Sequence, residues 1–287
     1  MRVRLINGDM VLELDPQAGG AVSALRHGDL EIFRPAPPRS GPAFDPLAYA
    51  AFPMVPFVGR IFEGRAKWQD HCLTLPANLP PEPHAIHGHG WRAAWSVADR
   101  DDTRISLSYT HDDDAWPWHY TAKQIYDLKS DGLVVDLSVK NEGDTPMPAG
   151  LGWHPYFYRA GAVLKTPTTR EWHPNDETGD SLPLKIAEEA DLSQGLPVEG
   201  LNLDTTYSLA KPIYEMQWPT HRVTMTADPV FAFATIYVPP GQDYFCAEPI
   251  SHAPFAINSS APMAETGLRS LAIGETLSGS ITLRAER

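Results

Sequence analysis

Two short segments of the chain each place a side chain that can transfer protons directly before a proline. His154 lies in Gly-Trp-His-Pro-Tyr-Phe, and Glu248 lies in Cys-Ala-Glu-Pro-Ile-Ser. An imidazole donates or accepts a proton near neutral pH, and a carboxylate is a natural partner base. Proline biases the preceding residue toward an extended backbone, so both residues are expected to be extended, and for His154 this is consistent with a strand end or a loop. The two segments indicate acid/base chemistry, although a buried, merely hydrogen-bonded histidine and a solvated glutamate are the structural alternatives.

Other segments supply groups suited to binding sugar hydroxyls. Arg60, in Val-Pro-Phe-Val-Gly-Arg-Ile, offers several donors, and Asp204, in Leu-Asp-Thr-Thr-Tyr, offers acceptors. An ion pair and an Asx turn are the structural alternatives for these two residues. Four tryptophans can present flat faces to a pyranose or fill the core. They are Trp91, Trp116, Trp118 and Trp153.

Three histidines lie close together in His-Ala-Ile-His-Gly-His-Gly-Trp, at His84, His87 and His89. One interpretation is a metal site, but no Asp, Glu or Cys within the segment completes a ligand set. We therefore expect no metal site there. The other interpretation is that one imidazole binds a sugar oxygen, and the spacing does not select which.

The elements that must position these residues are predicted to be almost entirely β-strands. Alternating residues on either side of Asn7-Gly8 predict a hairpin from Arg2–Ile6 and Met10–Leu14. A second hairpin is predicted from 121–128 and 133–139, with the apolar face of Leu133, Val135, Leu137 and Val139. Further strands are expected at 104–110, 222–226, 230–238 and 277–283. The best helical candidate is the short segment Leu184–Leu192.

Many short strands and 28 prolines favour a β-sandwich or barrel with long connections. Residues 34–40 and 166–200 are rich in loop-forming residues, but neither stretch marks a domain boundary. We expect a single domain over residues 1–287, since β-sandwiches often exceed the usual domain size.

Composition restricts the partners. The net charge of -13 argues against nucleic acid or an anionic membrane, both of which require concentrated Lys and Arg. Cys72 and Cys246 form no disulfide framework or metal motif, and no apolar segment has the length of a membrane span or a signal peptide. A cytoplasmic location and a small uncharged ligand are therefore expected.

Taken together and in this order, five motifs resemble those of the aldose 1-epimerase (mutarotase) family. They are Val-Pro-Phe-Val-Gly-Arg-Ile, His-Gly-His-Gly-Trp, Gly-Trp-His-Pro-Tyr-Phe, Leu-Asp-Thr-Thr-Tyr and Ala-Glu-Pro-Ile-Ser, and they span most of the chain. The resemblance implies a large galactose-mutarotase-like β-sandwich, an open sugar cleft and no required cofactor or metal. The positions that match the family's functional residues are Arg60, His87, His154, Asp204 and Glu248.

By this resemblance, Glu248 is the general base for the anomeric hydroxyl and His154 is the general acid for the ring oxygen. His154 would then hold a proton near neutral pH and Glu248 would remain ionised. Arg60, His87 and Asp204 would orient the sugar. We expect His154 and Glu248 to line one cleft, with room for a pyranose between their reactive atoms.

Two departures from the family pattern concern the substrate. Gly59 stands where mutarotases often carry Asn, and Tyr158 stands where galactose enzymes often carry Asn. A preference for galactose therefore does not follow. The alternatives are a hexose-6-phosphate 1-epimerase, with phosphate contacts from Arg65, Arg92 or Arg159, and a carbohydrate-binding protein without turnover.

Overall fold

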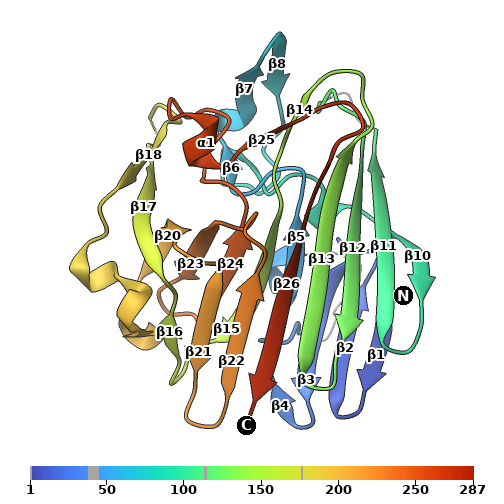
Figure 1. Cartoon of the computed structure of the whole chain (residues 1–287), viewed down its shortest axis with the longest axis vertical. Helices are drawn as coiled ribbons and strands as arrows, with labels where there is room; N and C mark the ends of the chain where they lie inside the picture. Colours follow the sequence, from blue (N-terminus) through green and yellow to red (C-terminus); the bar gives the residue numbers. More distant parts are fainter. Residues whose placement is uncertain (1, 38–44, 113–114, 176) are drawn as a thin grey trace.

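The computed structural model describes residues 2–37, 45–112, 115–175 and 177–287, and two large antiparallel sheets dominate it (Figure 1). The first sheet has eleven strands. Its order is β1 (Val3–Asn7), β2 (Met10–Asp15), β3 (Ala21–His27), β5 (Ala51–Met54), β15 (Gly152–Tyr158), β24 (Tyr244–Ile250), β23 (Phe233–Val238), β20 (Leu203–Leu209), β17 (Thr168–Pro174) and β18 (Ser181–Leu184), with β4 (Leu30–Glu31) beside β3.

The second sheet has nine strands. Its order is β10 (Ser96–Arg100), β11 (Arg104–His111), β12 (Tyr120–Leu128), β13 (Gly132–Asn141), β26 (Thr276–Glu286), β22 (Arg222–Ala227), β21 (Ile213–Gln217), β16 (Val163–Lys165) and β19 (Leu196–Pro197).

Short elements connect the two sheets. Three two-stranded sheets pair β14 (Met147–Ala149) with β25 (Arg269–Leu271), β6 (Arg60–Ile61) with β9 (Ala85–Ile86), and β7 (Arg65–Trp68) with β8 (His71–Thr74). The helical segments are α1 (Met263–Thr266) and the single 3-10 turns Pro46–Ala48, Phe62–Gly64, Gly90–Arg92, Glu188–Ala190, Leu192–Gln194 and Val198–Gly200. No helix within the described residues is long and apolar enough to cross a membrane.

The first sheet buries both of its faces, because alternate residues of its central strands belong to two different apolar clusters. Trp153 and Phe157 of β15 pack in the large core with residues of the second sheet such as Leu137. On the opposite, outer face, Tyr156 packs with Phe52 of β5 in a second cluster that loops cover. Since side chains alternate along a strand, His154 necessarily points to this outer face.

The all-β prediction and both predicted hairpins are confirmed. In the first hairpin Asn7 pairs with Met10, so the two-residue turn is Gly8-Asp9, with Gly8 at a φ of 61°. In the second, the four predicted apolar residues of β13 are all buried. The strands predicted at 104–110, 222–226 and 277–283 correspond to β11, β22 and β26.

Three expectations need correction. The predicted helix at Leu184–Leu192 is wrong, because β18 ends at Leu184 and only a 3-10 turn, Glu188–Ala190, follows within that range. A segment this short gains too little from packing to nucleate an α-helix, and Leu184 is exposed. The strand predicted at 230–238 begins at Phe233, and the stretch 166–200 contains β17, β18 and β19. Of the Pro-rich stretch 34–40, residues 38–40 lie outside the described residues.

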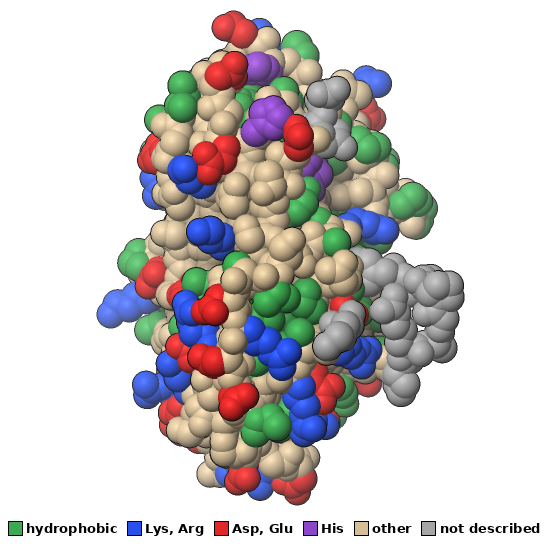
Figure 2. Space-filling view, turned by 90° about the vertical axis from the view of Figure 1, so that its right-hand side faces the viewer, with side chains coloured by type: hydrophobic (Ala, Val, Ile, Leu, Met, Phe, Trp, Pro, Cys, Tyr) green, Lys and Arg blue, Asp and Glu red, His purple; other side chains and the backbone are tan. Residues whose placement is uncertain are grey.

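The surface mixes charges of both signs. On the face drawn in Figure 2, Lys and Arg side chains are interspersed with Asp and Glu. Across β1, β2 and β3, both Arg4 and Arg26 lie within ion-pair distance of Glu13. The face drawn in Figure 2 therefore shows no continuous basic track of the kind that nucleic acids require.

Candidate active site

A row of side chains crosses the outer face of the first sheet, one from each of five neighbouring strands. The register pairs Gly152 with Ile250 and Tyr156 with Cys246, which puts His154 directly across from Glu248. Glu248 pairs with Thr235 of β23. The row continues through Thr206 of β20 to Trp172 of β17. All five side chains line one cavity.

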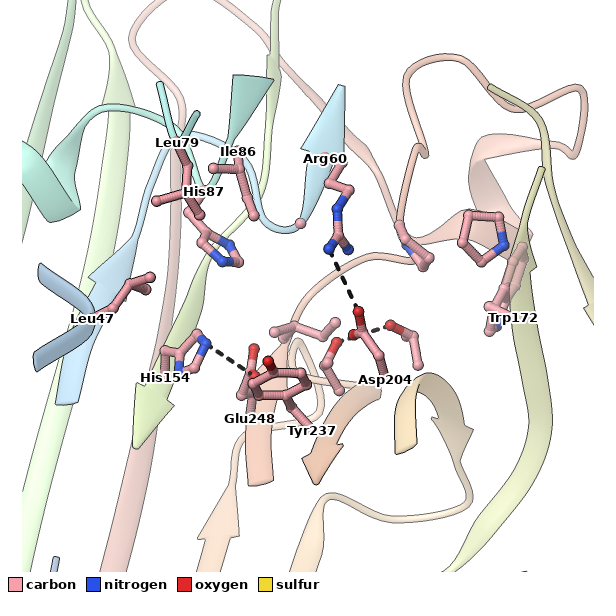
Figure 3. A pocket seen from close by; sticks show the side chains of 16 residues that line it. Leu47, Arg60, Leu79, Ile86, His87, His154, Trp172, Asp204, Tyr237 and Glu248 are labelled. Carbon is pink, nitrogen blue, oxygen red and sulfur yellow. Dashed lines mark hydrogen bonds and ion pairs between the residues drawn. The ribbon is translucent and has the colours of Figure 1, made fainter. Parts of the chain in front are cut away.

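The cavity has a volume of about 160 Å³, which is the volume of roughly five water molecules in the liquid and comparable with that of one monosaccharide. Figure 3 shows the labelled side chains that surround it. The sheet forms its floor, and the loops around β6 and β9 contribute Arg60, Ile86 and His87. The residues Leu47, Gly59, Leu79, Pro174, Asp204, Tyr237, Ile250 and Pro254 complete the lining.

His154 and Glu248 are in direct contact on the cavity floor (Figure 3). The His154 Nε2 atom lies 3.2 Å from the Glu248 Oε1 atom, and the two side chains are only 7% and 3% exposed. The expectation that a pyranose fits between them is therefore wrong. The ring oxygen and the anomeric oxygen of a sugar are bonded to the same carbon, so an acid and a base that act on both oxygens must converge.

Burial controls the protonation of this pair. It lowers the pKa of His154 to about 3 and raises the pKa of Glu248 well above its usual range. Both shifts disfavour charge, which differs from the expectation of a protonated His154 beside an ionised Glu248. The contact between the two side chains favours the charged forms instead, because an imidazolium on His154 and a carboxylate on Glu248 would stabilise each other. Either way the pair is neutral overall when it holds one proton, and that proton can reside on either partner.

Aromatic rings fix the orientation of His154. Its imidazole stacks on Tyr156 at 4.8 Å between ring centroids and contacts Phe52 at 4.5 Å. His87 approaches edge-on, with 5.5 Å between the two imidazole centroids. The Nδ1 atoms of His87 and His154 are buried and have no hydrogen-bond partner within the described part of the chain. Both imidazoles are thus held by packing.

Arg60 and Asp204 form a second pair at the mouth of the cavity. The guanidinium lies 3.4 Å from the Asp204 carboxylate and 3.5 Å from Glu82. With side-chain exposures of 29% and 51%, Arg60 and Asp204 remain accessible to water and to a ligand. The Arg60 charge also lowers the pKa of Glu248, against the effect of burial.

The backbone before Arg60 explains the glycine at position 59. Gly59 has a φ of 58°, and its carbonyl accepts a 2.8 Å hydrogen bond from the backbone N–H of His87. This left-handed conformation suits glycine and, among other residues, asparagine best. Gly59 and the Asn that mutarotases often carry at this position therefore both suit the left-handed backbone. With glycine, the cavity has no side-chain amide at this position.

Several residues suggested by the sequence lie elsewhere. Trp91, Trp116, Trp118 and Trp153 are fully buried and do not line the cavity. His84 accepts a hydrogen bond from the Glu63 backbone, and His89 stacks on His111 at 4.2 Å. In the described structure, His84, His87 and His89 do not converge on a common metal position.

The arginines considered for phosphate binding also lie outside the cavity lining. Arg159 donates to the carbonyls of Pro239, Glu199 and Leu201. Arg92 donates to the Asn78 carbonyl. Arg65 is exposed on β7.

Among the lining residues that sequence reasoning missed, four have side chains that can form hydrogen bonds. They are Trp172, Thr206, Thr235 and Tyr237. The hydroxyls of Thr206 and Thr235 are 2.8 Å apart, and Trp172 donates to Ser208 at 2.8 Å. Asp204 and Tyr237 are register partners on β20 and β23. Only Thr206 lay in a motif that sequence reasoning had considered.

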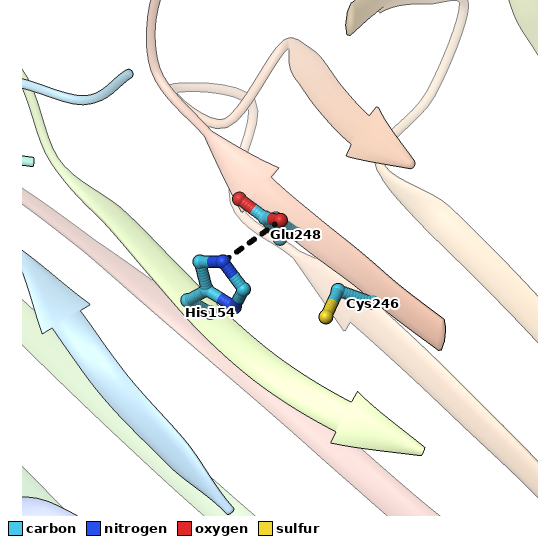
Figure 4. Close-up of side chains that lie close together, drawn as sticks. All are labelled: His154, Cys246 and Glu248. Carbon is cyan, nitrogen blue, oxygen red and sulfur yellow. Dashed lines mark ion pairs between the residues drawn. The ribbon is translucent and has the colours of Figure 1, made fainter. Parts of the chain in front are cut away.

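The described residues contain one close group of potential metal ligands, formed by His154, Glu248 and Cys246 (Figure 4). One ligand atom from each lies within 4.8 Å of the others. Imidazole, carboxylate and thiolate together suit zinc. However, burial raises the pKa of the Cys246 thiol well above its usual range, and the nearby Glu248 raises it further. A protonated thiol is a poor metal ligand.

Fold and cavity together define an all-β, galactose-mutarotase-like sandwich. The chain belongs to the aldose 1-epimerase family, whose model matches residues 1–284. The uncharacterised protein YphB of Escherichia coli K12 is 28% identical over 98% of both chains. A crystal structure of a candidate aldose 1-epimerase from the same organism has a TM-score of 0.89 at 27% identity, covering 100% of this chain and 99% of that one. A galactose mutarotase-like protein from Clostridium acetobutylicum has the same fold, with a TM-score of 0.88 at 20% identity over 100% and 95% of the two chains.

Proposed function

We propose that the protein is an aldose 1-epimerase that interconverts the α and β anomers of a free aldose. The observation that carries the proposal is the buried contact of His154 with Glu248 on the floor of a sugar-sized cavity. Arg60 and Asp204, accessible at its mouth, supply donors and acceptors for sugar hydroxyls, and His87 lies beside His154.

The reaction begins with one proton on the pair, carried by His154. Glu248 removes the proton of the anomeric hydroxyl, and His154 gives its proton to the ring oxygen. The bond between C1 and the ring oxygen breaks, its electron pair stays on that oxygen, and C1 becomes a carbonyl carbon. Rotation about the C1–C2 bond exposes the other carbonyl face, and the reverse transfers close the ring as the other anomer.

Burial assists this sequence. Ring opening changes the pair from a charged imidazolium and carboxylate to a neutral imidazole and carboxylic acid, while the number of protons on the pair stays at one. The neutral form is the one that burial favours at both residues. The desolvation that opposes the starting charges therefore stabilises the state that holds the open-chain sugar.

The test is anomer interconversion by purified, chelator-treated protein. Pure anomers of neutral, deoxy, acidic and phosphorylated sugars would be followed by polarimetry or NMR, with the spontaneous rate subtracted. We expect acceleration for at least one aldose, since His154 and Glu248 carry protons without a cation. Folded protein that accelerates none of the panel, but binds a sugar, would instead be a carbohydrate-binding module.

The hexose 6-phosphate alternative has less support. Arg60 is the cation in the described lining, and it lies beside two carboxylates, those of Asp204 and Glu82. A phosphate dianion needs donors that are not already neutralised. We therefore propose an uncharged aldose as the substrate.

A further inference from the structure

The two ends of the cavity differ in chemistry (Figure 3). Around Asp204 the lining carries the hydroxyls of Thr206, Thr235 and Tyr237 and the Arg60 guanidinium, with Trp172 on the same side. On the side of His154 and His87 the other labelled side chains are aliphatic, with Leu47 beyond His154 and with Leu79 and Ile86 beside His87. His87 borders this end too, but it faces His154 edge-on and so lies over the reacting groups.

The proposed roles of His154 and Glu248 determine how a pyranose is oriented between the two sides of the cavity. The orientation therefore rests on the proposed function. His154 addresses the ring oxygen and Glu248 addresses the anomeric oxygen. The row on the sheet runs from His154 through Glu248 to Thr235 and Thr206. In a pyranose, C2 lies on the side of C1 away from the ring oxygen, whereas C5 is bonded to the ring oxygen.

The C2 and C3 hydroxyls therefore face Asp204, Arg60 and the two threonines. The substituent on C5 extends past His154 toward Leu47, Leu79 and Ile86. A hydroxymethyl group placed there meets aliphatic side chains, which cannot replace the hydrogen bonds that its hydroxyl makes with water. A methyl group at the same position gains apolar contact.

We propose that the preferred substrate is a 6-deoxyhexose, an aldopyranose with a methyl group on C5. A pentopyranose, which lacks that methyl group, binds in the same orientation but leaves the apolar end partly empty. A hexose carries an unpaired hydroxyl into it. A hexose 6-phosphate is the poorest fit, because a dianion would enter an aliphatic end. The cation beside that end, Arg34, is outside the cavity lining and already donates to the carbonyls of Leu47 and Tyr49.

Matched sugar series test the proposal because each changes only the C5 substituent. One series is 6-deoxy-D-glucose, D-xylose, D-glucose and D-glucose 6-phosphate, and the other is 6-deoxy-D-galactose, L-arabinose and D-galactose. The measurement is kcat/KM for anomer interconversion above the spontaneous rate. We expect each 6-deoxyhexose to exceed its hydroxylated parent by roughly tenfold to a hundredfold, with the pentose between them.

A variant of the apolar end supplies a second readout. Leu79 is half-buried and borders the cavity, so Leu79→Asn adds an amide there and keeps the number and branching of the side-chain heavy atoms. We expect it to reduce the 6-deoxy-to-parent ratio about threefold or more by giving the hydroxyl a partner. Leu184→Asn is the matched control, because Leu184 is exposed and outside this cavity, and its ratio should equal that of the unaltered protein.

The outcomes separate the two proposals. Acceleration of several sugars with parent hexoses equal to or better than their 6-deoxy forms overturns the 6-deoxyhexose assignment and leaves the epimerase intact. A preference for D-glucose 6-phosphate overturns it as well. If no sugar in either series is accelerated by folded protein, the 6-deoxyhexose assignment fails, and the epimerase proposal fails with it when the broader panel gives no acceleration either.

Discussion

The sequence Trp-His-Pro occurs twice in the first sheet, and its two copies face opposite ways. In β15, Trp153 packs in the core between the sheets while His154 faces the cavity and contacts Glu248. In β17, Trp172 faces the cavity, whereas His173 is 55% exposed and contacts Glu171 at 2.7 Å. Both copies contain a histidine paired with a glutamate, but only the first pair is buried at a site.

The difference shows that register, not residue type, assigns the chemistry. A shift of one residue along a strand moves every side chain to the other face. The proline after each histidine extends the backbone in both copies and so does not distinguish them. What distinguishes them is the partner across the sheet, since the pairing of β15 with β24 brings Glu248 opposite His154.

The largest expected effect follows from changing the buried pair. His154→Asn and Glu248→Gln should each lower turnover by roughly a hundredfold or more, the scale for losing a positioned acid or base. His173→Asn provides the matched control, because it breaks the pair of His173 with Glu171, which lies outside the cavity on the same sheet, and should keep near-full turnover. Polarimetry with the spontaneous rate subtracted gives the measurement, and circular dichroism checks the fold.

Two outcomes would contradict the roles assigned to His154 and Glu248. Near-full turnover by Glu248→Gln would remove the proposed base. An equal loss in His173→Asn would mean that perturbing the sheet, and not removing the acid, lowers turnover.

Arg60 and Asp204 form the accessible pair at the mouth of the cavity, and changing Arg60 should have a smaller effect, mainly on KM. Arg60→Ala is expected to raise KM about tenfold with a lesser change in kcat, because Arg60 binds the sugar in its ground state; this holds where sugar dissociation is faster than turnover. Arg26→Ala, which breaks the 3.2 Å contact with Glu13 remote from the cavity, is the control and should leave KM unchanged. A change confined to kcat would assign Arg60 to the transition state instead.

The buried pair should also make stability depend on pH in a direction set by each shift. Because the folded-state pKa of Glu248 is raised, the unfolded chain releases this proton first as pH rises above 4.5, and the folded state loses stability up to its own higher pKa. Glu248→Gln has no such group, so its stability relative to the unaltered protein should grow between pH 5 and 8. Thermal unfolding measures this at roughly 2–4 °C for each kcal/mol.

For His154, the folded state loses stability as pH falls, not as pH rises. Its pKa falls to about 3 in the folded state, so the unfolded chain binds the proton first as pH drops below 6.5, and stability declines from there toward pH 3. His154→Asn should therefore gain relative stability as pH falls. A stability difference that is constant with pH for both variants would contradict the assignment of these shifts.

Local patterns explain which parts of the fold could be predicted. The apolar alternation of Leu133, Val135, Leu137 and Val139 is visible in the sequence and is confirmed by burial in β13. The segment Leu184–Leu192 misleads because its composition is compatible with a helix, while nothing in the sequence reveals that its first residue, Leu184, is the end of a strand paired with β17. Strand pairing between distant segments is the part that a single sequence leaves open.

The same limit applies to the cavity. His154, Glu248, Arg60, His87 and Asp204 could be selected because each lies in a distinctive motif, and all five line the cavity. Trp172 and Thr235 were missed because their position at the cavity depends on pairing through β20 and β23. The four tryptophans that attracted attention are in the core because large aromatic rings fill space there.

The smallest expected effect concerns Cys246, which shares the outer face with Glu248 but does not line the cavity. Cys246→Ser should keep turnover within about twofold, because the buried thiol is held in its protonated form and takes no part in proton transfer. Some stability should be lost, since the new hydroxyl is buried among apolar side chains. The measurement is turnover of chelator-treated protein before and after substitution, with zinc content measured in parallel. A tenfold or larger loss in folded Cys246→Ser protein, together with zinc that only the unaltered protein retains, would mean that Cys246, His154 and Glu248 hold a metal, and the metal-free mechanism would have to be abandoned.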